Sequence, residues 1–268
     1  MSNSEVVVVT GVSSGIGLAV AQSFVAKGYR VFGTVRSIAQ QNSIRGVELI
    51  EMNVCDDHSV EKAISDIVKR SFQIDILVNN AGVSLLGCIE ESSVQEAQLV
   101  FDTNLFGVLR TVRAVLPHMK ARKSGRIVNV SSVLGFLPAP YQGIYGSSKH
   151  ALEGFSETLD HEVRHFGVRV SLVEPSFTKT RFDANSARVQ TPLASYDTIR
   201  SDIEKAIAQN NLKAPGPEHV AKIVVEAAVG PWAMRHTASG EASKLRFIRR
   251  FLPSSLLDRG LRKTFGLS

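Results

Sequence analysis

Residues 5–17 read EVVVVTGVSSGIG, a β-branched run of strand length followed by a glycine-rich turn. A helical pattern comes next, with Ile16, Val20 and Phe24 on one face, and it closes at Gly28. In such a turn the missing side chains let backbone amides approach a pyrophosphate at the positive end of the helix. The spacing G-x-x-x-G-x-G differs from the commoner G-x-G-x-x-G, and a merely tight turn is the alternative. The flanking strand and helix favour a dinucleotide site.

The rest of the chain alternates between strand and helix patterns. Strands are expected at 29–35, 46–52, 74–80, 126–131 and 168–174, and helices at 94–122, at 145–166 and from 217 onwards. Parallel crossover units produce such an alternation, and near-continuous apolar strands fit a sheet covered on both faces. We therefore predict an α/β fold, with residues 1–268 forming a single doubly wound Rossmann-type domain. Its parallel sheet should have about seven strands, with helices on both faces.

The connection after Glu174 is unusually long, because about forty residues precede the helix expected at 217. A connection of this length in a compact domain usually serves as a lid or a binding loop. We expect a substrate lid at about 176–215, with one helix from about Tyr196 to Gln209.

The composition excludes several classes of protein. With 268 residues, 44% hydrophobic and 21% charged, the chain suits one domain with a sizeable core rather than a disordered segment. Cys55 and Cys88 are too few for a disulfide framework, so we expect reduced thiols in a cytoplasmic protein. No run reaches the ~18 apolar residues of a membrane span, and no leader pattern opens the chain. The histidines lack metal-ligand spacing, and we assign no metal.

The net charge of +6 is confined to the end of the chain. From Arg235 onwards there are eight Lys or Arg residues and two acidic ones, so the preceding part is neutral. The segment at about 241–268 is basic and amphipathic, and Pro253 interrupts it. Packing over the substrate pocket or a neighbouring subunit is the favoured interpretation. Contact with an anionic membrane surface is a second one. Nucleic-acid binding is the least favoured interpretation, because aromatic platforms on which bases could stack are missing and the rest of the chain is neutral.

The second predicted strand ends at GTVRS, where an NAD site would offer a carboxylate to the ribose hydroxyls. Val35 occupies that neighbourhood and Arg36 follows. An arginine complements a phosphate, whereas an acidic residue would repel one. We predict NADP(H) as the cofactor, with Ser13 as a second phosphate ligand. An ordinary surface arginine is the alternative.

Tyr145 and Lys149 stand four residues apart in YGSSK, at the start of a predicted helix. This spacing places the phenol and the ammonium on one helical face. Taken alone, such a pair usually marks a solvated surface, so the context has to decide.

That context is a set of five motifs. TGVSSGIG (10–17), NNAG (79–82), NLFG (104–107), SSVLG (131–135) and YGSSK (145–149) occur in order and spacing that resemble the short-chain dehydrogenase/reductases over about residues 5–230. Within that family the chain looks most like the 17β-hydroxysteroid-dehydrogenase-like and retinol-dehydrogenase-like branch.

The resemblance implies four catalytic residues. Tyr145 is the general acid/base, and the positive charge of Lys149 should lower the pKa of its phenol. Ser132 polarises the substrate carbonyl, with Ser131 as the alternative assignment. Asn104 positions a water in a proton relay, although a mid-helix Asn can also bond back to its own helix.

The resemblance also implies a set of cofactor-binding residues. They are Gly11, Ser13, Ser14, Gly15, Ile16, Gly17, Arg36, Asn53, Val54, Asn80, Ala81, Gly82, Tyr145, Lys149, Pro175 and Thr178. Two positions depart from the family pattern. Asn53 stands where an aspartate commonly meets the adenine, and Ser176 follows Pro175 in place of a glycine.

The expected activity is the interconversion of an alcohol with a ketone or aldehyde by hydride transfer. Apolar residues near the predicted pocket mouth suggest an apolar substrate, namely Leu85, Leu86, Phe136, Leu137, Pro138 and Phe177. By resemblance we expect a homodimer or homotetramer. The rivals are a regulatory protein that binds NADP(H) without turnover and a peripheral membrane dehydrogenase acting on lipid-like substrates.

Overall fold

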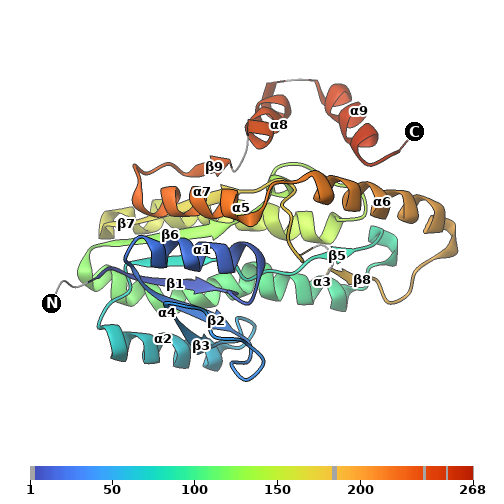
Figure 1. The fold of residues 1–268 in the computed structure, drawn as a ribbon. Helices are drawn as coiled ribbons and strands as arrows, with labels where there is room; N and C mark the ends of the chain where they lie inside the picture. Colours follow the sequence, from blue (N-terminus) through green and yellow to red (C-terminus); the bar gives the residue numbers. More distant parts are fainter. Residues whose placement is uncertain (1–3, 183–185, 238–239, 252, 268) are drawn as a thin grey trace.

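A computed structural model describes residues 4–182, 186–237, 240–251 and 253–267 of the chain (Figure 1). Small parts of the predicted domain, lid and basic segment, at 1–3, 183–185, 238–239, 252 and 268, lie outside the described residues. The main sheet has seven parallel strands in the order β3-β2-β1-β4-β6-β7-β9. They are β1 Val6–Thr10, β2 Arg30–Val35, β3 Val47–Glu51, β4 Ile76–Asn79, β6 Gly125–Val130, β7 Val168–Glu174 and β9 Arg235–Thr237. The predicted doubly wound α/β fold is confirmed.

Helices cover both faces of this sheet. On one face lie α2 (Asp57–Ser71), α4 (Gly107–Arg122) and α5 (Gly143–Val163), and on the other lie α1 (Gly15–Ala26) and α7 (Pro217–Val229) (Figure 1). Neighbouring residues of β1 alternate between the two cores, with Val8 facing the α2 side and Val7 the α1 side. Because both faces are buried, the strands are apolar without interruption.

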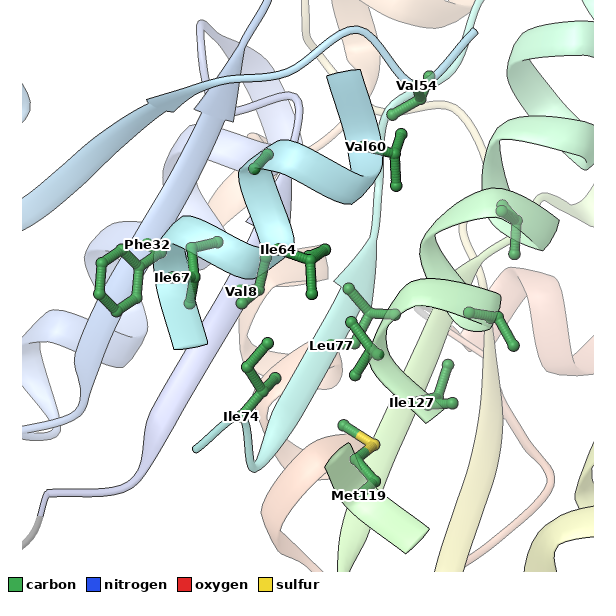
Figure 2. Packing of buried hydrophobic residues seen from close by; sticks show 14 of the residues in the cluster. Val8, Phe32, Val54, Val60, Ile64, Ile67, Ile74, Leu77, Met119 and Ile127 are labelled. Carbon is green, nitrogen blue, oxygen red and sulfur yellow. The ribbon is translucent and has the colours of Figure 1, made fainter. Parts of the chain in front are cut away.

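The core beneath α2 shows how tightly the layers pack. Ile64 and Ile67 of α2 lie against Val8 and Leu77 of the sheet, with Phe32 at one end of the cluster (Figure 2). All five side chains are almost completely buried. Truncating one of them to alanine, as in Leu77→Ala, should destabilise the fold by about 2–5 kcal/mol.

The strand order reverses next to β1, which pairs with β2 on one side and β4 on the other. In open parallel sheets, ligands bind at the carboxyl ends of the strands at such a reversal. The glycine turn follows β1 and the NNAG motif begins at the end of β4, so both motifs meet at this place.

The predicted helix at 94–122 is continuous but not uniform. It consists of α3 (Val94–Phe101), a π-helical segment (Asp102–Phe106) and α4. The lid contains α6 (Asp197–Lys213), which runs four residues beyond the expected end. Sequence patterns missed β9 and a small second sheet of β5 (Leu85–Leu86) and β8 (Ala187–Arg188), because two or three residues are too few to show a period.

The basic segment forms α8 (Gly240–Phe251) and α9 (Ser254–Thr264), which rise above the sheet domain in Figure 1. Leu257 and Phe265 are buried, and Phe265 packs with Leu86, in the short β5, and Ile203 of the lid. This contact supports the packing interpretation of the segment. Among the described helices, none combines the length and apolar character needed to cross a bilayer.

Candidate active site

The glycine turn can be built only with glycine at its key positions. Gly11 and Gly15 have φ values of +72° and +58°, in the left-handed region that side chains disfavour. A Cβ on Gly17 would lie 2.2 Å from the Gly11 carbonyl oxygen. Ser13 and Ser14 are exposed at the amino end of α1, and the Ser14 side chain makes no capping hydrogen bond. The turn therefore presents backbone amides and two hydroxyls, which suits a pyrophosphate.

The NNAG motif braces this turn. The Thr10 hydroxyl accepts hydrogen bonds from the Asn80 and Ala81 amides, at 2.9 Å each. The Asn80 side chain donates to the carbonyls of Thr10 and Gly11, at 2.9 and 3.1 Å. Asn80 therefore shapes the nucleotide site by holding the turn. Thr10 was missed by sequence reasoning, although it is the first letter of the glycine motif.

Arg36 lies directly after β2, exposed to solvent. Two residues earlier, the Thr34 carbonyl accepts the amides of Gly11 and Val12, at 3.1 Å each. This pairing places the end of β2 beside the glycine turn. Among the described residues, no hydrogen bond or ion pair engages the Arg36 guanidinium, so its charge is available to an anion.

Asn53 has a structural task at the end of β3. Its side-chain oxygen accepts the Cys55 amide at 3.1 Å, and its own amide donates to Ser59 at 2.9 Å. The oxygen that was expected to face the adenine thus stabilises its own turn. The adjacent Val54 packs against the start of α4, where a Cβ on Gly107 would lie 3.0 Å from Val54 Cγ2.

Tyr145 and Lys149 face the same way on α5. Lys149 Nζ lies 5.8 Å from the centroid of the Tyr145 ring and donates to the Val130 carbonyl at 2.8 Å. Both side chains are buried. Burial lowers the pKa of Lys149 to about 8, while the negative charge of Glu153 acts in the opposite direction. The solvated-surface alternative for this pair is wrong.

Asn104 projects from the π-helical segment and is 1% exposed. Its side chain bonds to both backbone groups of Val83, at 2.9 Å each, and donates to the Ser148 hydroxyl at 3.0 Å. It does not bond back to its own helix. A Cβ on Gly82 would lie 3.3 Å from Asn104 Oδ1 and 3.9 Å from Lys149 Nζ, so these three residues meet. Local π-helices are frequent at functional sites.

The two serines after β6 differ in their surroundings. Ser132 is half-buried, and its hydroxyl accepts the Leu134 amide at 3.1 Å. Ser131 is buried, and its hydroxyl points inward, since a Cβ on Gly135 would lie 2.7 Å from both Ser131 Oγ and Glu153 Oε1. This arrangement favours Ser132 over Ser131 as the residue that reaches a substrate.

Residues 175–182, at the start of the predicted lid, lie next to the candidate site. Pro175 accepts the Val133 amide at 2.9 Å, and the buried Thr178 donates to the Ser176 carbonyl at 3.0 Å. Thr180 comes within 3.4 Å of the position of a Cβ on Gly15. The ring of Phe182 lies 5.7 Å from that of Tyr145. This stretch therefore touches both the glycine turn and the proposed acid/base.

The apolar residues predicted at the pocket mouth separate into two groups. Leu86 and Phe177 belong to a cluster with Ala139 and the lid helix α6. Leu85 lies in a second cluster, and Leu137 is 2% exposed. Leu137 is therefore core packing rather than a lining residue.

Two buried carboxylates bind residues 190–200 of the predicted lid, and sequence reasoning missed both. Glu91 accepts the Leu193 amide at 2.7 Å and pairs with Arg200 of α6. Although burial alone would raise the pKa of Glu91, hydrogen bonds from the Leu193 and Cys88 amides and from Arg200 lower it. Glu96 accepts the Gln190 amide at 2.9 Å. The capping box of Ser93 and Glu96 could have signalled one of these carboxylates.

Comparison with known proteins agrees with this geometry. A family model described as short chain dehydrogenase matches residues 5–190. The chain belongs to the short-chain dehydrogenase family. This short-chain dehydrogenase is 38% identical over 181 residues to the 3-ketodihydrosphingosine reductase of Bacteroides thetaiotaomicron, covering 68% of this chain and 66% of that protein. It is 39% identical over 189 residues to human retinol dehydrogenase 8, covering 66% of this chain and 60% of that protein. The family and branch predicted from the five motifs are confirmed.

Solved structures extend the comparison to nearly the whole chain. A short-chain dehydrogenase from Streptomyces avermitilis matches with a TM-score of 0.82 and 31% identity, over 97% of each chain. A short-chain dehydrogenase from Burkholderia phymatum in complex with NAD matches with a TM-score of 0.78 and 27% identity, over 91% of this chain and 92% of that one. A metagenomic short-chain oxidoreductase in complex with NADP matches with a TM-score of 0.70 and 26% identity, over 88% of this chain and 98% of that one.

Proposed function

We propose that this short-chain dehydrogenase interconverts an alcohol and a ketone or aldehyde by hydride transfer, with NADP(H) as its cofactor. The observation that carries the proposal is the buried pair on α5, with the Lys149 ammonium 5.8 Å from the ring centroid of Tyr145. Gly82, three residues after the end of β4, lies beside that ammonium. The pair is therefore next to the motif that braces the glycine turn.

The four predicted residues can share the work of proton transfer. A bound nicotinamide would supply the hydride for reduction or accept it for oxidation. Tyr145 donates its phenolic proton to the substrate oxygen during reduction and takes it back during oxidation. The charged form of Lys149 stabilises the phenolate. Ser132 holds the substrate oxygen, and Asn104 fixes the backbone at Val83, the neighbour of Gly82, which lies beside Lys149.

Turnover of a panel of carbonyl compounds tests this proposal. NADPH oxidation is measured with ketones and aldehydes for wild type and Tyr145→Phe, together with the NADPH affinity of each. We expect turnover in wild type and a loss of about 10²–10⁴-fold in the variant, since general acid catalysis contributes that much. If both proteins bind NADPH and neither reduces any carbonyl, the regulatory alternative replaces the enzyme.

The preference for NADP(H) is supported by the free charge of Arg36 and the exposed Ser13. Dissociation constants for NADPH and NADH are compared in wild type, Arg36→Ala and Arg45→Ala, whose arginine is also exposed. We expect Arg36→Ala to weaken NADPH binding by at least about tenfold and to spare NADH. An unchanged ratio of the two constants would remove Arg36 from the phosphate site.

An apolar substrate is supported by the cluster of Leu86, Phe177 and Ala139 beside the lid. The two relatives described above carry the names of a retinol dehydrogenase and a ketosphingoid reductase, and both names denote long apolar substrates. Within the panel, kcat/KM should rise with the length of the alkyl chain, because each added CH₂ group buries more apolar surface. A gain of ~1.4 kcal/mol from this burial corresponds to a tenfold rise in kcat/KM.

Peripheral membrane association is a second candidate property, favoured by one observation. Phe247 and Phe251 of α8 are 61% and 63% exposed, with the exposed Arg249 and Arg250 between them. Such a face fits an anionic lipid surface. Salt-sensitive co-sedimentation with phosphatidylserine vesicles, lost in the Phe247→Ser and Phe251→Ser double variant, is the expected result. No sedimentation at low salt would end the idea.

We also propose a homodimer or homotetramer in the cytoplasm. The oligomer is supported by Leu99, Phe106 and Leu109, which are exposed along the α3–α4 helix as an interface would require. The cytoplasmic location is supported by the free thiols of Cys55 and Cys88. Light scattering should give a mass of two or four chains, and Leu99→Glu with Phe106→Glu should reduce it. A monomeric wild type would contradict the proposal.

A further inference from the structure

A cluster of buried charges lies behind the proposed catalytic residues. Glu153 of α5 is 5% exposed, and Glu174 at the end of β7 is completely buried. Arg235 of β9 and Arg246 of α8 reach these two carboxyl groups from the carboxyl-terminal part of the chain. We call these four residues the carboxylate cluster. None of them has a part in the chemistry proposed above.

Arg235 is the centre of the cluster. Its guanidinium lies 2.5 Å from Glu153 Oε2, 3.6 Å from Glu174 Oε1 and 2.9 Å from Glu157 Oε1. Arg246 stands 3.8 Å from Glu174 Oε2. Glu153 Oε1 and both oxygens of Glu174 are buried without a hydrogen-bond donor among the described residues. Two adjacent carboxylates are costly to bury, so the ionised state of the pair depends on both arginines.

The cluster touches the site on three sides. Glu153 follows Lys149 by one helical turn, and Glu174 directly precedes Pro175. A Cβ on Gly135 would lie 2.7 Å from Glu153 Oε1, so this carboxyl group also lies beneath the short turn after Ser132. Helix α8 contacts that same turn as well as β9. Helix α8 is thus joined to the site through the cluster.

Glu153 is the charge that acts on Lys149, and further charged groups lie on α5 and on the elements packed against it. On α5 the charged groups include Glu153 and, one turn further, Glu157. The neighbouring β7, β9 and α8 contribute Glu174, Arg235 and Arg246. The turn at 133–135 contributes no charged residue. On the remaining helix packed against α5, Asp102 pairs with Arg110, and Glu96 accepts hydrogen bonds from Ser93 and Gln190.

These charges act on one another in a definite direction. Burial and the negative charge of Glu153 raise the pKa of Glu174 to about 7, whereas the charges of Arg246 and Arg235 oppose the rise. Losing either arginine should therefore let Glu174 take up a proton near neutral pH. With less negative charge beside it, the buried Lys149 would in turn lose its proton more easily.

We propose that Glu153 is a positioning residue that keeps Lys149 charged, and that Arg246 makes this function depend on the docking of helix α8. The proposal rests on the proposed function in one respect, the need for a charged Lys149. It gives the basic segment a role in proton transfer that is separate from covering the substrate. It also gives a reason for two carboxyl groups to be buried side by side.

The titration of Lys149 tests the proposal without requiring turnover. The protein is labelled with ¹³C-lysine, the Lys149 ε-methylene signal is assigned by its loss in Lys149→Met, and its chemical shift is followed against pH. In Glu153→Gln the midpoint should fall, by about one pH unit, because the negative charge of Glu153 raises the pKa of Lys149. Glu157→Gln, which removes a half-exposed carboxylate on the same arginine, should leave it in place. An unchanged midpoint in Glu153→Gln overturns the proposal.

Arg246→Gln provides the second variant, since this side chain is half-exposed and its loss should leave the fold intact. We expect a smaller shift of the same sign, with no shift in Arg249→Gln on the exposed face of the same helix. If the Lys149 midpoint were the same in Arg246→Gln as in Arg249→Gln, the link to α8 would be overturned. If a carbonyl substrate is found, the alkaline limb of kcat/KM should move with the NMR midpoint. A moved midpoint in a protein that turns over no carbonyl would sustain the cluster and contradict only the proposed enzyme.

Discussion

The proposed nucleotide side and the proposed substrate side of the site are held together by different kinds of interaction. On the nucleotide side, Thr10 and Asn80 bond to backbone groups of the glycine motif and the NNAG motif, which lie next to each other in space. On the substrate side, Glu91 bonds to the Leu193 amide, 102 residues away, and pairs with Arg200. A scaffold of neutral backbone bonds should tolerate changes of pH. A lid fastened by buried carboxylates should not.

Of the substitutions considered for the two sides, replacing the buried Lys149 should lower kcat/KM the most. Lys149→Met removes the charge beside Tyr145 and the donor to the Val130 carbonyl. We expect kcat/KM to fall by about 10³-fold, within the range of general acid–base catalysis. Lys179→Met, which changes an exposed lysine at the start of the lid, is the matched control. Equal activity in the two variants would show that the α5 pair is not used.

A single methyl group should break the nucleotide side. In Gly17→Ala the new Cβ would lie 2.2 Å from the Gly11 carbonyl oxygen, so the turn must move. NADPH affinity should fall by about 10²-fold, equivalent to ~3 kcal/mol. Gly154→Ala on α5, where a Cβ meets nothing within 4 Å, should leave binding unchanged and stabilise the helix by up to about 1 kcal/mol. Calorimetric titration and thermal unfolding measure both effects.

Weakening the lid should affect the substrate and not the nucleotide. Glu91→Gln leaves Arg200 with only Asp197 as a charged partner. We expect KM to rise by about tenfold, or ~1.4 kcal/mol, with NADPH affinity unchanged. Asp197→Asn, which removes an exposed partner of the same arginine, should change KM by less than about twofold. A parallel loss of NADPH affinity in Glu91→Gln would show that the two sides are not independent.

Acid should loosen the lid before the nucleotide side. Because the pKa of Glu91 is lowered in the folded protein, its contribution to stability is present above its unfolded value of 4.5. That contribution is lost as the pH falls through the folded value. Amide exchange of α6 should therefore accelerate in acid relative to β1, measured by mass spectrometry. Glu91→Gln should abolish the difference, and a lid that stays protected in acid would contradict this account.

The nucleotide side was predictable because its determinants are local. Gly11, Gly15 and Gly17 are close in sequence, and the backbone conformations they permit are what the turn uses. The pair on α5 was predictable for the same reason, since one helical turn joins Tyr145 to Lys149. The burial of both residues comes from the packing of α5 on the sheet, which the four-residue spacing alone does not indicate.

The substrate side was not predictable beyond its approximate bounds. The contacts of Glu91 with residues 193 and 200 depend on how the segment after β7 folds back towards Glu91. No local sequence pattern encodes that long-range arrangement. The two-residue strands β5 and β8 are defined by each other and show no period of their own. The π-helical segment at Asn104 was hidden within a regular helical pattern. The ion pair of Arg246 with Glu174 required the position of α8.

The central claim is that Tyr145 and Lys149 transfer a proton while a nicotinamide bound beside them exchanges a hydride with a carbonyl carbon. The most direct measurement uses NADPH in which both hydrogens on the hydride-donating carbon of the nicotinamide are deuterium. Products from the best carbonyl substrate are analysed by mass spectrometry for wild type and Tyr145→Phe, both saturated with the nucleotide. The account predicts one deuterium on the former carbonyl carbon with wild type and almost no product with the variant. Unlabelled alcohol from wild type, or equal yields of labelled alcohol from both proteins, would contradict it.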